Sequence, residues 1–165
     1  MKEQVEKLDG FLSGVAAFSG ALRDHTAFSY MVSLSEARSS AEEALAAHFS
    51  WRPNLTFSSV HELQHGLADL ELGLRPFLVK NFRFGTKEEV SDLRKYLSFR
   101  VMEYVCAVVE DKTVSKVLKL VADSGPYESS SVFFCVCLET EVLFMQFNDD
   151  TGFKKGRARL TERSG

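Results

Sequence analysis

Hydrophobic residues recur along most of this chain at spacings that separate helices from strands. Over residues 2–24 the apolar positions fall three and four residues apart, which predicts an amphipathic helix. Over residues 26–34 they alternate with serines, which is the period of a half-buried strand. Helical spacing returns over residues 35–49, and the proline-containing segment 50–54 is predicted to be a loop.

The next apolar positions also follow a helical period. Val60, Leu63, Leu67, Leu70 and Leu74 predict a helix. Gly73 and Pro76 supply its stop signal, and residues 77–84 read as a strand that begins after the proline.

A second helical stretch begins at a capping box formed by Thr86 and Glu89. A long helix is predicted from Lys87, although residues 101–109 are rich in β-branched side chains and also fit a strand. A short helix is predicted over residues 114–121.

The C-terminal part carries the clearest strand pattern. The apolar runs 132–138 and 142–147 are separated by three polar residues, which predicts a β-hairpin whose first strand is covered on both faces. The sequence of residues 153–160 is also compatible with a third strand. The chain is therefore expected to form one α+β domain over residues 1–165, with helices packed on a small antiparallel or mixed sheet that ends in a C-terminal β-hairpin.

Composition supports a folded protein. Hydrophobic residues make up 45% of the 165 positions and charged residues 26%, which is typical of a globular domain. The charged N-terminus does not resemble a signal peptide, and no apolar run approaches the roughly 18 residues that span a bilayer. We expect a soluble cytoplasmic protein without a membrane partner.

Charge is unevenly distributed along the chain. Residues 151–165 carry five basic side chains and one acid, a net +4, which leaves −7 on residues 1–150 out of a total of −3. The acidic body disfavours broad nucleic-acid binding and suits either a basic partner or simple solubility. The basic end, residues 151–165, is interpreted as a solvated C-terminal strand or tail.

The three cysteines do not form an evident disulfide framework. Cys135 and Cys137 lie two residues apart in an apolar run, so a strand points both thiols to the same face. Together with Cys106 they are expected to be free thiols in a reducing compartment, with the pair buried.

One short motif suggests chemistry. His61-Glu62-Leu63-Gln64-His65 matches the pattern H-E-x-x-H, and in this respect the chain resembles the zincin metallopeptidases. The resemblance covers about ten residues and implies that His61 and His65 bind zinc while Glu62 is the general base. It depends on a helix, because only a helix places the two imidazoles one turn apart on the same side.

Two observations weaken the zinc interpretation. A catalytic zinc takes a third protein ligand, and the candidates, Glu88, Glu89 and Glu103, lie in no recognisable companion motif. In addition, Ser59 and Glu62 fit a capping box, which gives Glu62 a structural role at the start of a helix. No phosphate-binding loop, nucleophile turn or metal-spaced cysteine set is present in the sequence.

The sequence therefore favours a binding protein that uses no cofactor. A small, acidic, single-domain protein with a Phe-rich hairpin is similar in general style to the bacterial immunity proteins that neutralise toxins. That resemblance implies tight association with a basic toxin domain, steered by acidic residues around an apolar centre. A chaperone for a secreted effector is the alternative within the binding class. The candidate partner-binding residues lie at the hairpin ends and in the preceding loop: Tyr127, Glu128, Glu139, Glu141, Asp149 and Asp150.

Overall fold

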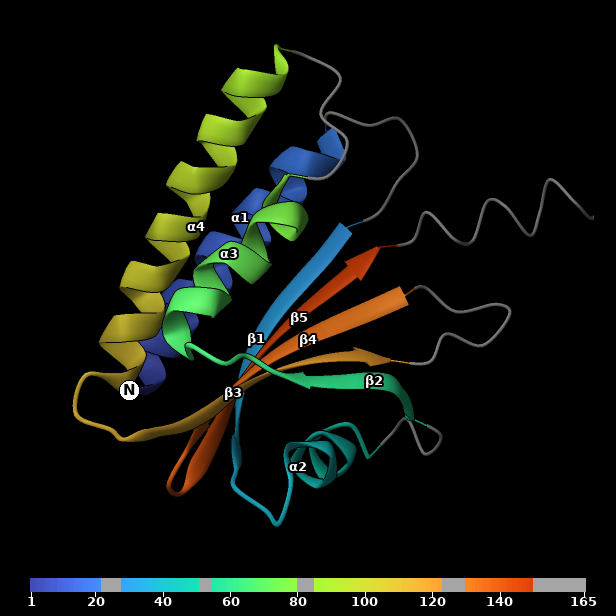
Figure 1. The fold of residues 1–165 in the computed structure, drawn as a ribbon, viewed down its shortest axis with the longest axis vertical. Coiled ribbons are helices and arrows are strands. Elements are labelled where there is room, and N and C mark those ends of the chain that lie inside the picture. Colours follow the sequence, from blue (N-terminus) through green and yellow to red (C-terminus); the bar gives the residue numbers. More distant parts are fainter. Residues whose placement is uncertain (22–27, 51–54, 80–84, 123–129, 150–165) are drawn as a thin grey trace, which may run out of the picture.

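The two C-terminal apolar runs pair as the predicted hairpin, formed by β4 (Ser130–Leu138) and β5 (Glu141–Asp149). The computed structural model describes residues 1–21, 28–50, 55–79, 85–122 and 130–149. In this part of the chain β4 is the middle strand of a five-stranded antiparallel sheet with the order β1-β5-β4-β3-β2 (Figure 1). The remaining strands are β1 (Phe28–Glu36), β2 (Phe57–Glu62) and β3 (Val114–Ala122). The predicted α+β class is confirmed.

The described helices form two layers of unequal size on the sheet. Three helices, α1 (Lys2–Ala21), α3 (Leu67–Leu78) and α4 (Lys87–Val109), cover one face, and α2 (Ala41–His48) covers the other (Figure 1). Apolar residues of β4 alternate between two cores. Phe134 and Val136 pack beneath the three helices, whereas Phe133, Cys135 and Cys137 pack beneath α2. The prediction that this strand is covered on both faces is confirmed.

Helix α1 and strand β1 agree with the predicted pattern. Val5, Leu8 and Leu12 are buried against the sheet, as their spacing indicates. Phe18, predicted on the same stripe, is instead half exposed. The Asp9 carboxylate accepts a hydrogen bond of 2.7 Å from the backbone N–H of Val32, so α1 also satisfies a donor on the outer edge of the sheet.

Helix α2 begins later than the sequence pattern suggests. Residues 35 and 36 still belong to β1, and the cap is Ser40, whose hydroxyl accepts a hydrogen bond of 3.2 Å from the Glu43 N–H. Pairing with β5 extends β1 through Glu36. Sheet pairing therefore overrides the local helical period at this boundary.

Helix α3 continues through its predicted stop signal. Gly73 packs over the Phe134 ring, and Pro76 lies in the last turn. The C-terminal carbonyls of this region find side-chain donors, because Tyr30 Oη donates to the carbonyl of Phe77 and the Arg94 guanidinium donates to that of Val79. The predicted strand over residues 77–84 is wrong at its start, where residues 77 and 78 are helical, and its remainder from residue 80 lies outside the described residues.

Helix α4 begins at the predicted capping box. The Thr86 hydroxyl accepts from the Glu89 N–H, and the Glu89 carboxylate accepts from the Thr86 N–H at 2.7 Å. Residues 101–109, whose sequence fits either a helix or a strand, are helical, and Val101, Val105 and Val108 point into the core.

The predicted short helix over residues 114–121 is wrong, because this segment is strand β3. It pairs with β4 on one side and with β2 on the other. Val117 is buried on the face under the three helices, while Leu118 and Leu120 are buried on the face under α2. A strand with apolar residues on both faces lacks a simple alternation, so its pattern also fits a helix.

Candidate functional site

The H-E-x-x-H segment does not lie on a helix. His61 and Glu62 are the last two residues of strand β2, and α3 begins only at Leu67. Neighbouring strand residues point to opposite faces, so His61 lies beside Lys119 on one face and Glu62 beside Leu118 on the other. The capping box of Ser59 and Glu62 is also absent, because both residues belong to the strand. The helical geometry on which the zincin resemblance depends is therefore wrong.

His65 has a structural role at the start of α3. Its backbone N–H donates to the Asp69 carboxylate at 2.9 Å, and its Nδ1 lies 3.2 Å from the same carboxylate. These contacts lower the pKa of Asp69, with the backbone hydrogen bond from His65 as the largest cause. Gly66, the cap between them, has a positive φ of 57°, which favours glycine.

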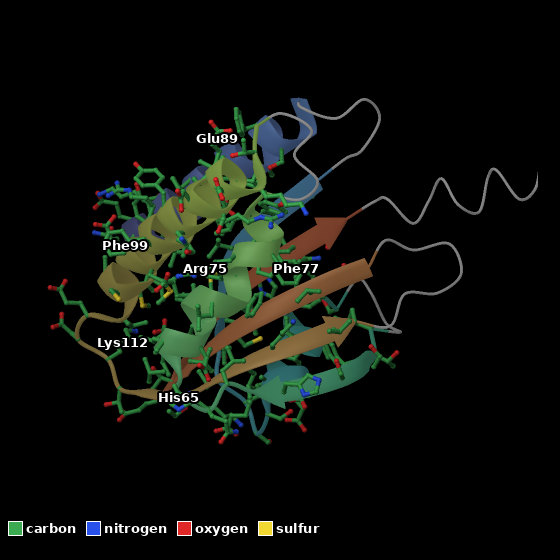
Figure 2. The ribbon with its side chains drawn as sticks, turned by 45° about the horizontal axis from the view of Figure 1, so that its top comes forward. His65, Arg75, Phe77, Glu89, Phe99 and Lys112 are labelled. Carbon is green, nitrogen blue, oxygen red and sulfur yellow. The ribbon has the colours of Figure 1, made fainter. Side chains whose placement is uncertain are left out.

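The three candidate third ligands belong to α4 and do not converge on the histidines. Glu88 and Glu89 are in the first turn, where Glu89 caps the helix, and Figure 2 shows Glu89 and His65 at opposite ends of the molecule. Glu103 pairs with Arg100 on the exposed side of α4. Within the five described ranges, no group of three or more His, Cys, Asp or Glu side chains is placed to hold a metal ion.

The predicted acidic surface is divided between the two ends of the sheet. Glu139 and Glu141 are at the tip of the β4–β5 hairpin, where Glu141 pairs with the Lys112 ammonium and lies opposite Glu36 of β1. Asp149 is at the other end of β5 (Figure 1). Its Cα is eight residue steps along the strand from that of Glu141, or about 26 Å at about 3.3 Å per step. The structure therefore places Glu141 and position 149 at opposite ends of β5.

The other predicted partner-binding residues, Tyr127, Glu128 and Asp150, lie outside the described residues, as does the basic segment 151–165.

A different group of exposed side chains follows the outer side of α4. Glu88, Asp92, Tyr96, Phe99 and Glu103 recur at spacings of four, four, three and four, which places them along one side of the helix. All five are exposed, and we call them the outer stripe. Figure 2 shows Phe99 pointing away from the sheet.

The aromatic residues of the outer stripe are unusually accessible. Tyr96 is 61% exposed and Phe99 58%, and on the adjacent helix α3 Leu72 is 57% exposed. Two of the stripe's carboxylates form ion pairs on the same helix, Asp92 with Lys95 at 3.1 Å and Glu103 with Arg100. Exposed pairs of this kind contribute little to stability, so their carboxylates remain available to another cation.

The sequence of α4 already indicates this surface, in addition to the pattern of apolar residues that predicts the buried side of the helix. Val90, Leu93, Leu97, Val101, Tyr104 and Val108 account for the buried side of α4. Tyr96 and Phe99 fall on the opposite side of the same helical wheel, where polar residues are expected. Large aromatic residues outside a helix's buried stripe are candidates for contact with another molecule.

The cysteines agree with their predicted chemical state. All three are free thiols, with Cys135 and Cys137 buried and Cys106 exposed on α4. Burial is the largest cause that raises the pKa of both Cys135 and Cys137, and for Cys135 the neighbouring Cys137 and Glu42 act in the same direction. These two thiols are therefore packing groups of the core under α2.

Comparison of the chain with protein-family models, curated proteins and solved structures finds no match. Among the helices in the described ranges, none is long and apolar enough to cross a membrane.

Proposed function

We propose that this protein is a binding protein that neutralises a toxin by tight association, and that the outer stripe of α4 is its contact surface. The observation that carries the proposal is the exposed pair Tyr96 and Phe99 within a row of carboxylates. Aromatic residues are enriched among the side chains that dominate binding energy at protein interfaces.

Charge supports a basic partner. Glu88, Asp92 and Glu103 flank the two aromatic residues along the helix, where Lys95 and Arg100 pair with Asp92 and Glu103. The body of the chain, residues 1–150, carries a net charge of −7. A row of acids around an apolar centre accelerates encounter with a cationic surface, and the apolar centre then slows dissociation. This is the arrangement that the immunity-protein resemblance implies, now assigned to α4 instead of the hairpin ends.

The experiment is a toxin-inhibition assay with single substitutions in the stripe. A candidate toxin domain encoded beside this chain's gene is titrated with wild-type protein, with Tyr96→Ala and with Phe99→Ala. Each substitution is expected to weaken inhibition by about tenfold or more, as at other aromatic interface centres. The matched control is Met31→Ala on β1, an exposed apolar residue away from α4, which is expected to inhibit as well as the wild type.

Two results would contradict the proposal. One is a wild-type protein that forms no complex with the toxin, and the other is a Tyr96→Ala/Phe99→Ala double variant that inhibits as strongly as the wild type. The assay also separates toxin inhibition from the chaperone alternative. A chaperone binds the unfolded or extended effector, whereas the proposed inhibitor binds and inactivates the folded domain.

A further inference from the structure

A lysine interrupts the apolar row of β3 on the sheet face that carries α1, α3 and α4. From Val117 onward, the residues of β3 on this face are Val117, Lys119 and Val121, and Lys119 is half-buried. Its Nζ lies 5.4 Å from the centre of the Phe77 ring and 6.0 Å from that of Phe134. The faces of aromatic rings attract a cation but leave its hydrogen-bonding capacity unused.

No carboxylate neutralises this ammonium in the part of the chain that the structure describes. The acid nearest to it in the sheet, Glu62, is on the opposite face of β2. A partly desolvated charge without a counter-ion is unfavourable, and two benzene rings compensate for it only in part. The position therefore attracts an anion.

The residues around Lys119 restrict the kind of anion that can bind there. His61 lies directly beside it in the neighbouring strand and is exposed, so its imidazole offers a second donor. Phe77, Val121 and Val132 are only half-buried around the lysine, because the helical layer does not extend over the β2 margin of this face (Figure 1). Figure 2 shows Phe77 on the last turn of α3, above the strands.

We propose that this corner of the sheet, formed by His61, Phe77, Lys119, Val121 and Val132, binds a monocarboxylate attached to an apolar or aromatic group. The Lys119 ammonium pairs with the carboxylate, His61 donates a further hydrogen bond, and the apolar group contacts Phe77 and the two valines. Phosphate is a poorer match, because it carries more charge and needs more donors than one lysine and one histidine supply.

Two sources share this chemistry, a free carboxylic acid and the C-terminal residue of a peptide. The probes are therefore phenylacetate and N-acetylphenylalanine, each compared with its uncharged amide, and the readout is the chemical shifts of backbone amides. Saturable shifts centred on β2 and β3 are expected for at least one carboxylate, with about tenfold or weaker binding of its amide. A response to phenylacetate alone indicates a small acid, and a response to N-acetylphenylalanine alone indicates a peptide terminus.

Substitutions connect the shifts to the lysine. Lys119→Met keeps the aliphatic stem and removes the charge, so it is expected to lose carboxylate binding, while Lys119→Arg is expected to retain it. The control is Lys116→Met, three residues earlier on the same strand and exposed to solvent. Thermal unfolding of each variant checks that the fold is intact. If Lys119→Met does not fold, His61→Leu removes the second donor and is expected to weaken carboxylate binding.

Equal binding of a carboxylate and its amide would overturn the inference. So would tighter binding of inorganic phosphate, or the absence of saturable shifts up to the solubility limit of both probes. Because this corner and the outer stripe of α4 share no residue, failure here leaves the proposed toxin-binding surface untouched, and the toxin assay does not depend on Lys119.

Discussion

Gly73 of α3 lies directly over the ring of Phe134 in the central strand: a Cβ atom added at Gly73 would be 3.0 Å from Cε1 of that ring. The contact is tighter than ordinary van der Waals separation. Phe134 is fully buried and is held by ring contacts with Phe77 and Phe147, so it has little freedom to withdraw. Glycine at this position lets the helix approach the sheet closely.

Gly73→Ala is therefore expected to destabilise the protein despite the better helix propensity of alanine. Alanine gains about 1 kcal/mol in a helix interior, and overpacking a rigid core costs about 1–3 kcal/mol, so the net loss is about 1 kcal/mol. Urea unfolding measures it. The matched control is Gly14→Ala on α1, where nothing lies within 4 Å of the added Cβ and stabilisation of about 0.5–1 kcal/mol is expected. If both variants are stabilised, the close packing of α3 on Phe134 is wrong.

The capping box of α4 supports a second prediction. Thr86→Ala removes the acceptor for the Glu89 N–H and is expected to lower the free energy of unfolding by about 1 kcal/mol. Thr86→Ser keeps the hydroxyl and is expected to change it far less. Chemical denaturation of the two variants beside the wild type provides the measurement, and equal stability of all three would show that the cap contributes nothing.

The contrast between α4 and β2 shows what local sequence can predict. At α4 the cap, the apolar stripe and the tertiary contacts all favour a helix, so the prediction is correct. At β2 the local pattern, a serine followed by a glutamate and leucines at helical spacing, also favours a helix. Pairing with β3 makes this segment a strand instead, and it joins residues such as His61 and Lys119 that are 58 positions apart. No local period contains that information.

For the candidate site too, the predictions were correct where local sequence decides the structure and wrong where strand pairing decides it. The H-E-x-x-H motif was found from sequence, but its chemistry required a helix that the sheet replaces with a strand. The acidic hairpin tip was located correctly, yet strand length separates Glu141 from Asp149. The outer stripe of α4 was predictable, because its helix was correctly assigned and its two aromatic residues lie opposite the buried stripe. The position of Lys119 was not predictable, because β3 is buried on both faces and its apolar pattern also fits a helix.

Asp69 makes the stability of the protein depend on acid pH. Its pKa lies below the ordinary value of 3.8, because the folded state donates hydrogen bonds to the carboxylate from His65. A carboxylate with a lowered pKa in the folded state adds stability above its unfolded pKa and loses it as the pH falls through the folded pKa. Asp69→Asn is therefore expected to be less stable than wild type at neutral pH, and the difference is expected to shrink toward strongly acid pH.

Unfolding at a series of pH values tests this linkage. The control is Asp111→Asn, which removes a carboxylate in the exposed turn after α4 that does not receive the hydrogen bonds of His65. A difference for Asp69→Asn that stays constant, or that grows as the pH falls, would contradict the assigned role of the His65–Asp69 hydrogen bonds.

The three thiols are expected to differ in reactivity by position. Cys106 is exposed on α4, whereas Cys135 and Cys137 are buried and their raised pKa values keep them protonated. An aromatic disulfide reagent that releases a coloured thiolate should therefore modify one thiol rapidly in the folded protein at mildly alkaline pH. After denaturation it should modify all three. Cys106→Ser should abolish the rapid phase. The other two thiols should still be modified after denaturation. Rapid modification of two or three thiols in the folded state would mean that the sheet face under α2 is open to solvent.

The proposal that the outer stripe of α4 is a contact surface makes opposite predictions for stability and for binding. Tyr96 and Phe99 are mostly exposed, so their replacement by alanine removes little buried area, and each change in unfolding free energy is expected to stay within about 0.5 kcal/mol. Val101, buried on the other side of the same helix, is the contrasting position, where Val101→Ala is expected to cost about 1–3 kcal/mol. Thermal unfolding of the three variants separates these cases.

If Tyr96→Ala or Phe99→Ala destabilises the isolated protein as much as Val101→Ala, these aromatic residues serve the fold, and the proposed partner surface loses its physical basis. If both are neutral for folding and weaken toxin inhibition, exposure without a folding role is explained by the partner.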